Sequence, residues 1–315
     1  MLQKLRKVTS ILLMALLIVL EFSVPNVSAT AANSHMAFTK KTTTLKAGKT
    51  YTYQTNMPKE HTKWTVSNSK IASISKDGKL TAKKYGQVTV TATYQTKKVS
   101  CKVTITPKKI IGLDAGHQAH QNKGLEPIGP GSKTKKPKVS SGTSGVATKV
   151  NEYELNLTVA KKLRTELENR GYKVIMTRTS HKVNISNKER ALLLNKHHCD
   201  LVIRLHADGS DNSRETGAST LYTSTHNRYV KKSLSKKNKR LATTILTSYC
   251  KETKIKNRGA VPRDDLTGNN YSKVPTIVLE MGFMSNAKED RNMQKSSTQK
   301  KMVNGISNGI DKYFA

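Results

Sequence analysis

The spacing of the apolar residues changes near residue 107 and divides the chain into two regions of different architecture. Before this point apolar and polar residues alternate with a period of two, as in Val88–Tyr94, which is typical of strands that bury one face. Beyond it, short apolar runs alternate with segments whose apolar residues recur every four positions, as from Leu155 to Leu167. We therefore predict a small all-β sandwich over residues 38–106. We predict an α/β domain over residues 107–315, with a mostly parallel sheet flanked by helices.

The first 31 residues have the composition of a secretory signal peptide. Basic residues precede the apolar run Ile11–Leu20, and small residues follow the run. A membrane anchor is the alternative, but this run is too short to span a bilayer, which needs about 20 residues. We therefore expect cleavage near Ala29 or Ala31. The mature chain should be secreted, act outside the cell or in the cell wall, and contain no membrane span.

The chain carries a large excess of positive charge. It has 56 Lys and Arg residues against 21 Asp and Glu residues, a formal net charge of +35. An excess of this size favours polyanionic partners. Aromatic residues make up only 5% of the sequence, which argues against a surface that stacks nucleic-acid bases. Together with export, the charge favours polyanions outside the cell over nucleic acid; for a bacterial wall these would be anionic wall polymers, lipids and the carboxylates of peptidoglycan.

Four ionisable residues of the second region are expected to meet. His117, His206 and Glu280 each follow a short apolar run that predicts a strand. Ligands of an open parallel sheet bind beyond the carboxyl ends of its strands, so these three side chains should converge. Glu152 lies one turn before the apolar face of a predicted helix and should point inward at the start of that helix.

Two imidazoles and two carboxylates form a set that suits metal-assisted hydrolysis. A catalytic zinc takes three protein ligands, typically from His and carboxylate side chains, and keeps its fourth position for water. A further carboxylate can take a proton from that water and return it to the leaving nitrogen. The spacing alone is not specific, since no H-E-x-x-H motif is present. A structural role for each histidine is the alternative at this point.

Four segments of the first region, together with the predicted strand Val88–Tyr94, form a recognisable pattern. The segments are Lys46–Gly48 before a predicted strand, Trp64–Asn68, Ile71–Gly78 and Leu80–Gly86. With them, residues 38–106 resemble the bacterial immunoglobulin-like domains of group 2. The resemblance implies a spacer or adhesion module without an active site, in which Trp64 is a core residue rather than a ligand-stacking one.

A series of motifs extends through most of residues 109–315. They are Leu113–His117, Glu152–Leu157, Gly171–Val174 with Thr177-Arg178, Ser186–Arg190, Arg204–Asp208, Gly217-Ala218, and Val278–Phe283 with Ser285-Asn286. In content and order they resemble the zinc-dependent N-acetylmuramoyl-L-alanine amidases, which are cell-wall hydrolases. The resemblance implies Zn²⁺ as the cofactor and Glu280 as the catalytic acid and base. The implied metal ligands are His117, Glu152 and His206. Glu154 is the rival of Glu152, but the family's Glu usually stands four residues before the helix Asn, as Glu152 does.

The sequence departs from the family pattern close to the predicted ligands. Gln118–His120 replace the usual Gly-rich continuation, and Ala207-Asp208 replace an Ala-Asn pair. Residues 118–149 form a long insert between the first two ligands. These changes affect the expected substrate contacts more than metal binding. We expect the insert to be either a mobile lid over the groove or a disordered loop.

These patterns together predict a secreted zinc hydrolase of peptidoglycan. It would cleave the amide bond between N-acetylmuramic acid and L-alanine of the stem peptide. One alternative is a secreted wall-binding protein whose enzyme domain is inactive. Another is a zinc peptidase that cuts within stem peptides, and a third, suggested by charge alone, is a nucleic-acid-binding protein.

Overall fold

The computed structural model describes residues 35–315. The predicted signal peptide and its cleavage site lie outside the described residues. Within residues 35–315, no helix has both the length and the apolar character needed to cross a bilayer.

The first region is a β-sandwich, as the alternating pattern predicts. Strands β2, β9, β8 and β5 form one sheet, β3, β7 and β6 form a second, and β1 pairs with β4. Inward residues such as Val90, Val103 and Leu80 are completely buried between the sheets. The strands are β1 Phe38–Lys40, β2 Thr44–Lys46, β3 Thr50–Thr52, β4 Gln54–Thr55, β5 Lys63–Val66, β6 Ala72–Ile74, β7 Lys79–Ala82, β8 Gly86–Tyr94 and β9 Lys97–Thr106.

The second region is built on a six-stranded sheet in the order β13-β10-β14-β17-β15-β16. Every neighbouring pair is parallel except β15 and β17, which are antiparallel. The sheet is therefore mixed, with the mostly parallel arrangement that the sequence predicts. Its strands are β10 Ile110–Ala115, β13 Lys173–Met176, β14 Leu201–Asp208, β15 Ala218–Tyr222, β16 Asn257–Pro262 and β17 Thr276–Phe283.

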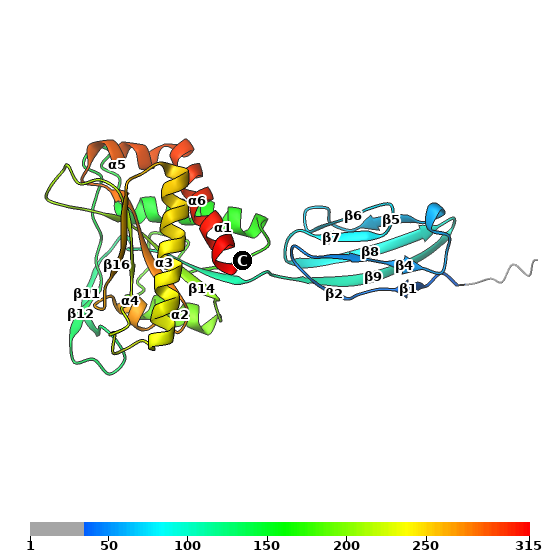
Figure 1. The fold of residues 1–315 in the computed structure, drawn as a ribbon, viewed down its shortest axis with the longest axis horizontal. Helices are drawn as coiled ribbons and strands as arrows, with labels where there is room; N and C mark the ends of the chain where they lie inside the picture. The colour runs from blue at the N-terminus through cyan, green and yellow to red at the C-terminus, as the bar shows by residue number, and fades with distance from the viewer. Residues whose placement is uncertain (1–34) are drawn as a thin grey trace, which may run out of the picture. The chain divides into compact units, whose positions relative to one another are not determined.

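Helices cover both faces of this sheet. Figure 1 shows α1, α3 and α6 side by side, and their apolar faces pack on one face of the sheet, while α2 packs on the other. The alternation along β14 explains this division, because Ile203 and Leu205 point into the first core and Val202 into the second. The helices are α1 Glu152–Asn169, α2 Asn187–Lys196, α3 Lys232–Thr253, α4 Thr267–Asn270, α5 Ala287–Gln294 and α6 Ser296–Phe314.

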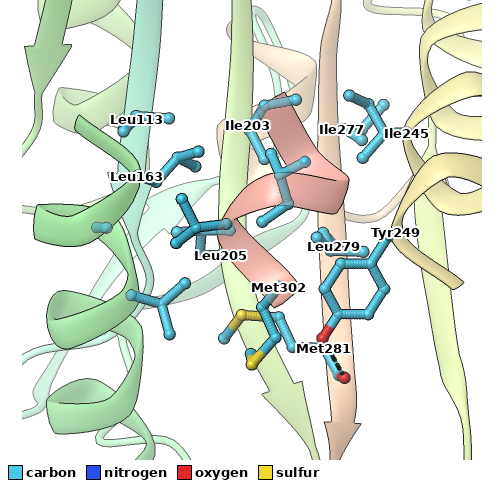
Figure 2. Packing of buried hydrophobic residues seen from close by; sticks show 14 of the residues in the cluster. Leu113, Leu163, Ile203, Leu205, Ile245, Tyr249, Ile277, Leu279, Met281 and Met302 are labelled. Atoms are coloured by element: carbon cyan, nitrogen blue, oxygen red, sulfur yellow. Dashed lines mark hydrogen bonds between the residues drawn. The ribbon is translucent and has the colours of Figure 1, made fainter. Parts of the chain in front are cut away.

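The larger core joins the three central strands to the helices (Figure 2). Leu113, Ile203 and Ile277 come from β10, β14 and β17, and none of them has measurable exposure. Tyr249 of α3 is also buried, and its hydroxyl donates a hydrogen bond to the carbonyl oxygen of Met281, 2.8 Å away. This core fixes β10, β14 and β17 against one another, so the positions of their carboxyl ends are fixed as well.

The helix boundaries follow the signals in the sequence. Helix α1 ends at Asn169, and Gly171 takes the left-handed conformation two residues later, with φ of 87°. At the start of α2, the Ser186 hydroxyl accepts from the backbone N–H of Glu189, and the Glu189 carboxylate accepts from the N–H of Ser186. This is the capping box that the sequence predicts.

The insert contains an antiparallel hairpin formed by β11 Asn122–Pro127 and β12 Lys135–Val139. Lys136 of this hairpin forms an ion pair with Asp265, with the charged atoms 2.5 Å apart. Nearer to α1, the backbone N–H groups of Ala147 and Thr148 both donate to the Asp290 carboxylate at 2.8 Å. The expectation of a disordered loop is therefore wrong, because the insert pairs with itself and bonds to the rest of the domain.

Two glycines allow α3 and α6 to approach closely. A Cβ atom at Gly305 would lie 2.7 Å from the Cα of Tyr249, and one at Gly309 would lie 3.0 Å from the Cα of Ile245. These glycines are four residues apart on α6, so they face α3 on the same side of the helix. A larger side chain at either position would push the two helices apart.

We predict that Gly305→Ala lowers the free energy of unfolding by about 1–3 kcal/mol. Alanine is by itself more favourable than glycine in a helix by about 1 kcal/mol. A net loss of stability in the variant would therefore be due to the steric clash with α3. Urea unfolding of the full chain should be followed by helical circular dichroism, since all the α-helices described lie in the second region. Lys301→Ala, at an exposed position of α6, is the control. Equal stability of the two variants would show that the helices can separate freely.

Candidate metal centre

The carboxyl ends of three neighbouring strands meet at one edge of the sheet. Strand β14 lies between β10 and β17 and is parallel to both. His117 follows the end of β10 by two residues, whereas His206 and Glu280 are register partners within the last part of β14 and β17. The predicted convergence is present, but the strands extend further than predicted, because their pairing continues past the apolar runs.

His117 is held in an unusual backbone conformation. Its φ is 60°, in the left-handed region that residues other than glycine seldom adopt. Its Nδ1–H donates to the carbonyl oxygen of Ser140 at 2.9 Å, since that oxygen can only accept. The lone pair of Nε2 is therefore free to face the neighbouring ligands.

Glu152 is the first residue of α1 and is only 4% exposed. Its Oε2 accepts from the backbone N–H of Thr143 at 3.0 Å, and its Oε1 accepts from the N–H of Ala207 at 3.1 Å. The rival residue, Glu154, has a different task. Its carboxylate accepts from the N–H of Asn151 at 2.9 Å and completes the capping box of α1.

His117, Glu152 and His206 direct one ligand atom each toward a common point. The Nδ1 of His206 lies 3.1 Å from both the Nε2 of His117 and the Oε1 of Glu152. The Nε2 of His117 lies 3.2 Å from the Oε2 of Glu152. All the ligand atoms are within 4.8 Å of one another.

This donor set fits a metal ion such as zinc. Tetrahedral bonds of 2.0–2.1 Å place ligand atoms about 3.3 Å apart, close to the separations found between these three side chains. Although burial opposes it, contact with both imidazoles holds the pKa of Glu152 well below its usual range. Burial lowers the pKa of His206 to about 4. The contact with Glu152 opposes this change, whereas the neighbouring His117 adds to it. A neutral imidazole and an ionised carboxylate are the forms that bind metal.

Glu280 lies beside the three ligands in a cavity of about 680 Å³. Burial raises the pKa of the Glu280 carboxyl well above its usual range. The neighbouring negative charges of Glu152 and Asp208 add to this increase. A carboxyl group in this environment has an increased affinity for protons, so it can accept one from a neighbouring acid and return it to a base. The structure thus brings all four predicted site residues into one cavity. The residues that line this cavity are His117, Gly142, Thr143, Glu152, His206, Ala207, Asp208, Gly209, Ser210, Asp211, Glu280 and Ser285.

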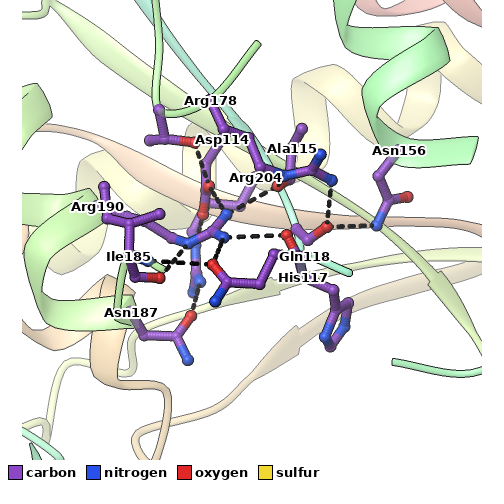
Figure 3. Close-up of polar contacts among 12 residues, drawn as sticks. Asp114, Ala115, His117, Gln118, Asn156, Arg178, Ile185, Asn187, Arg190 and Arg204 are labelled. Carbon is purple, nitrogen blue, oxygen red and sulfur yellow. Dashed lines mark hydrogen bonds and ion pairs between the residues drawn. The ribbon is translucent and has the colours of Figure 1, made fainter. Parts of the chain in front are cut away.

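A buried ion network lies beneath the cluster (Figure 3). The Asp114 carboxylate accepts from Arg190 at 2.8 Å, from Arg204 at 2.9 Å and from the Thr177 hydroxyl at 2.7 Å. Although burial alone would raise it, the two guanidinium groups hold the pKa of Asp114 well below its usual range.

Arg190 of this network, together with Arg178, holds the backbone that carries His117. Arg190 donates to the carbonyl oxygens of Ala115 and His117, at 2.8 and 3.0 Å. Arg178 donates to the carbonyl oxygens of Ala115 and Gly116, also at 2.8 and 3.0 Å. These bonds orient three successive peptide groups, which explains how His117 keeps its positive φ.

Sequence reasoning did not find the partners that orient the ligands. Ser140 and Thr143 lie on the insert, where neither apolar spacing nor a motif marks them. Arg178, Arg190 and Arg204 stand within the quoted motifs, but without a predicted role. Sequence reasoning also missed Gly142, where a Cβ atom would lie 2.5 Å from the Oε2 of Glu152.

Comparison with known proteins agrees with both predicted resemblances. The family described as N-acetylmuramoyl-L-alanine amidase matches residues 111–312, and the bacterial Ig-like domain (group 2) matches residues 24–103. N-acetylmuramoyl-L-alanine amidase LytC of Bacillus subtilis (strain 168) is 27% identical over 163 residues, which are 52% of this chain and 31% of that protein. This chain therefore matches about a third of the length of LytC. A putative N-acetylmuramoyl-L-alanine amidase of Buchnera aphidicola subsp. Baizongia pistaciae is 28% identical over 232 residues, covering 65% of this chain and 96% of that protein.

Solved structures show the same α/β fold. The apo form of the N-acetylmuramyl-L-alanine amidase Ami1 from Mycobacterium abscessus superposes with a TM-score of 0.60 at 24% identity, covering 66% of this chain and 100% of that chain. The N-acetylmuramoyl-L-alanine amidase from Clostridium difficile 630 gives a TM-score of 0.54 at 24% identity, with 66% and 98% coverage. These similarities confirm the fold class of the second region.

We predict that Asp114→Asn lowers the free energy of unfolding by about 3–5 kcal/mol, because it leaves two buried guanidinium groups without their counter-charge. Urea unfolding in the presence of a chelator, followed by helical circular dichroism, would measure the loss apart from any metal effect. Asp211→Asn removes the same charge at an exposed position and should change stability by less than about 0.5 kcal/mol. Similar losses in both variants would contradict a central role for Asp114.

Proposed function

The chain belongs to the N-acetylmuramoyl-L-alanine amidase family, and on that premise we propose that it hydrolyses the amide bond between N-acetylmuramic acid and L-alanine of the peptidoglycan stem peptide. The observation that supports this most directly is the meeting of His117, Glu152, His206 and Glu280 in one cavity. The cavity opens on the surface at the carboxyl edge of the sheet, where a polymer can reach it.

We infer that the metal is zinc and that His117, Glu152 and His206 hold it. Bound zinc would polarise the scissile carbonyl and lower the pKa of a water molecule. Two imidazoles and one carboxylate leave room for that water. Ser140 orients His117, and the N–H groups of Thr143 and Ala207 orient Glu152, so the protein sets the direction of each ligand.

Glu280 moves the proton in this proposal. It accepts a proton from the attacking water, whose oxygen bonds to the carbonyl carbon of the lactyl group. It then delivers that proton to the nitrogen of L-alanine as the carbon–nitrogen bond breaks. The products are a free carboxylate on the sugar and a stem peptide with an N-terminal alanine.

We further propose that the enzyme is secreted and is retained on anionic wall polymers by its basic surface. The sequence supports secretion through the predicted signal peptide in residues 1–31. It supports retention through the charge of residues 38–106, which contain fourteen lysines, no arginine and only two acidic residues. Attraction of this kind acts over roughly the Debye length, about 8 Å at physiological ionic strength.

We predict that Glu280→Gln retains zinc but loses about 10²–10⁴-fold in turnover, because only the proton transfer is removed. His206→Ala should lose both zinc and activity, because a ligand is removed. Metal analysis of the purified variants and mass spectrometry of fragments released from peptidoglycan would measure both effects. His226→Ala, at an exposed histidine, is the control and should behave as the wild type.

Several outcomes would contradict these roles. Normal wall digestion by Glu280→Gln would exclude the proton transfer assigned to Glu280. A full zinc complement in His206→Ala would remove His206 from the ligands. Fragments cut within the stem peptide would indicate a peptidase, and wild-type protein that releases nothing with zinc would indicate a wall-binding protein without activity.

We predict that salt weakens binding to purified walls more than it slows turnover of small soluble fragments, because retention is electrostatic and the reaction is local. Sedimentation of the protein with walls over a series of salt concentrations would measure binding, and release of stem peptide from soluble fragments would measure turnover. Wall binding that does not depend on ionic strength would require another explanation for the basic charge.

A further inference from the structure

The β-sandwich contains a cavity of about 540 Å³ that takes no part in the proposed reaction. Its volume is within the range of small-ligand sites in proteins, about 300–1,000 Å³. All of its lining comes from the first region, between residues 39 and 79. The lining residues are Thr39, Thr52, Tyr53, Gln54, Thr55, Met57, Lys59, Thr62, Trp64, Ser75, Asp77 and Lys79.

An aromatic cluster forms one side of this cavity. The ring centroids of Trp64 and Tyr53 are 6.3 Å apart, and Phe38 packs against both rings at 6.3 and 5.7 Å. Tyr53 is buried, with 1% exposure, whereas Trp64 is only partly buried. Trp64 therefore packs on the core, as the sequence predicts, and also lines the cavity.

A glycine turn packs closely against the indole. A Cβ atom at Gly78 would lie 3.0 Å from both Cε2 and Cζ2 of Trp64 and 2.7 Å from the carbonyl oxygen of Tyr53. Gly78 also has φ of 77°, which side chains other than glycine disfavour. The turn at Asp77-Gly78 can therefore lie against the indole of Trp64, and Asp77 of this turn lines the cavity.

The rest of the lining is rich in hydrogen-bonding groups. Thr39, Thr52, Gln54 and Ser75 are exposed side chains that offer hydroxyl and amide groups. Lys59 and Asp77 form an exposed ion pair at 3.2 Å. Lys79 adds a further positive charge to the rim. An apolar ligand would leave these groups without partners, so the lining favours a ligand with many hydroxyl or amide groups.

We propose that this cavity is a binding site for a sugar of the wall glycan, such as an N-acetylated pyranose ring. A pyranose has C–H groups on its flat faces, which suit the negative face of an indole ring, and hydroxyl groups around its edge, which suit the Thr, Ser and Gln side chains. The ammonium group of Lys79 suits the carboxylate of a muramyl sugar. The identity of the wall glycan as the ligand rests on the proposed function.

Such a site would hold the enzyme on the polymer that it cleaves without touching the scissile bond. A second weak contact raises the effective concentration of a tethered catalytic domain on its substrate. It also supplements charge-based retention with recognition that salt does not screen strongly.

The single tryptophan of the chain makes the test direct, because Trp64 is the only source of indole fluorescence. The full-length protein should be titrated with a tetramer of N-acetylglucosamine, which has no stem peptide and no bond that an amidase would cleave. We expect a saturable change in tryptophan emission. The double variant Gln54→Ala with Lys79→Ala should weaken binding about tenfold or more, through the lost hydrogen bonds.

The matched control is Gln87→Ala with Lys102→Ala, two exposed positions on β8 and β9 that do not line the cavity. It should bind within about twofold of the wild type, and unfolding midpoints should be the same for both double variants. No saturable response in the wild type, or equal binding by the two variants, would overturn the proposal. An equal or stronger response to the free stem peptide, or to a polyanion such as polyphosphate, would also overturn it. None of these results depends on amidase activity.

Discussion

The candidate metal centre depends on one buried carboxylate beneath it. Asp114 binds both Arg190 and Arg204, and buried guanidinium groups without a counter-charge would be strongly destabilising. Arg190 also holds the carbonyl oxygens of Ala115 and His117. The conformation of the segment that carries His117 is therefore set by an ion network of the protein itself.

Much of the site could be predicted because parallel strands place their carboxyl ends together. The apolar runs located three strands, and the helical spacing located Glu152, so convergence followed from the topology. The capping box explains why Glu154 could not take the same place, since its carboxylate is bonded to the N–H of Asn151. Strand ends were predicted less well, because His206 and Glu280 stay in the sheet through backbone pairing that does not require apolar side chains.

The rest could not be predicted because it depends on contacts between distant segments without a periodic pattern. Ser140 and Thr143 orient His117 and Glu152 from an insert rich in Gly, Lys and Ser. Composition of this kind usually predicts disorder, but Asp290 bonds to its backbone from more than 140 residues away. The antiparallel placement of β15 beside β17 likewise follows from packing between segments and not from the spacing of residues in β15.

The two regions are suited to different kinds of recognition because their glycines allow different close contacts. At the metal centre, Gly116 and Gly142 leave space where a Cβ would collide with His206 or Glu152, so ligand atoms can approach within about 3 Å of one another. Each oxygen of Glu152 accepts a backbone N–H, which keeps the ligands directed before any metal binds. In the β-sandwich Gly78 instead lets a turn pack against the indole ring of Trp64. A charged site whose ligand atoms are held close together suits catalysis on one bond, whereas an aromatic cavity lined with hydrogen-bonding groups suits repeated, weak contact with a polymer.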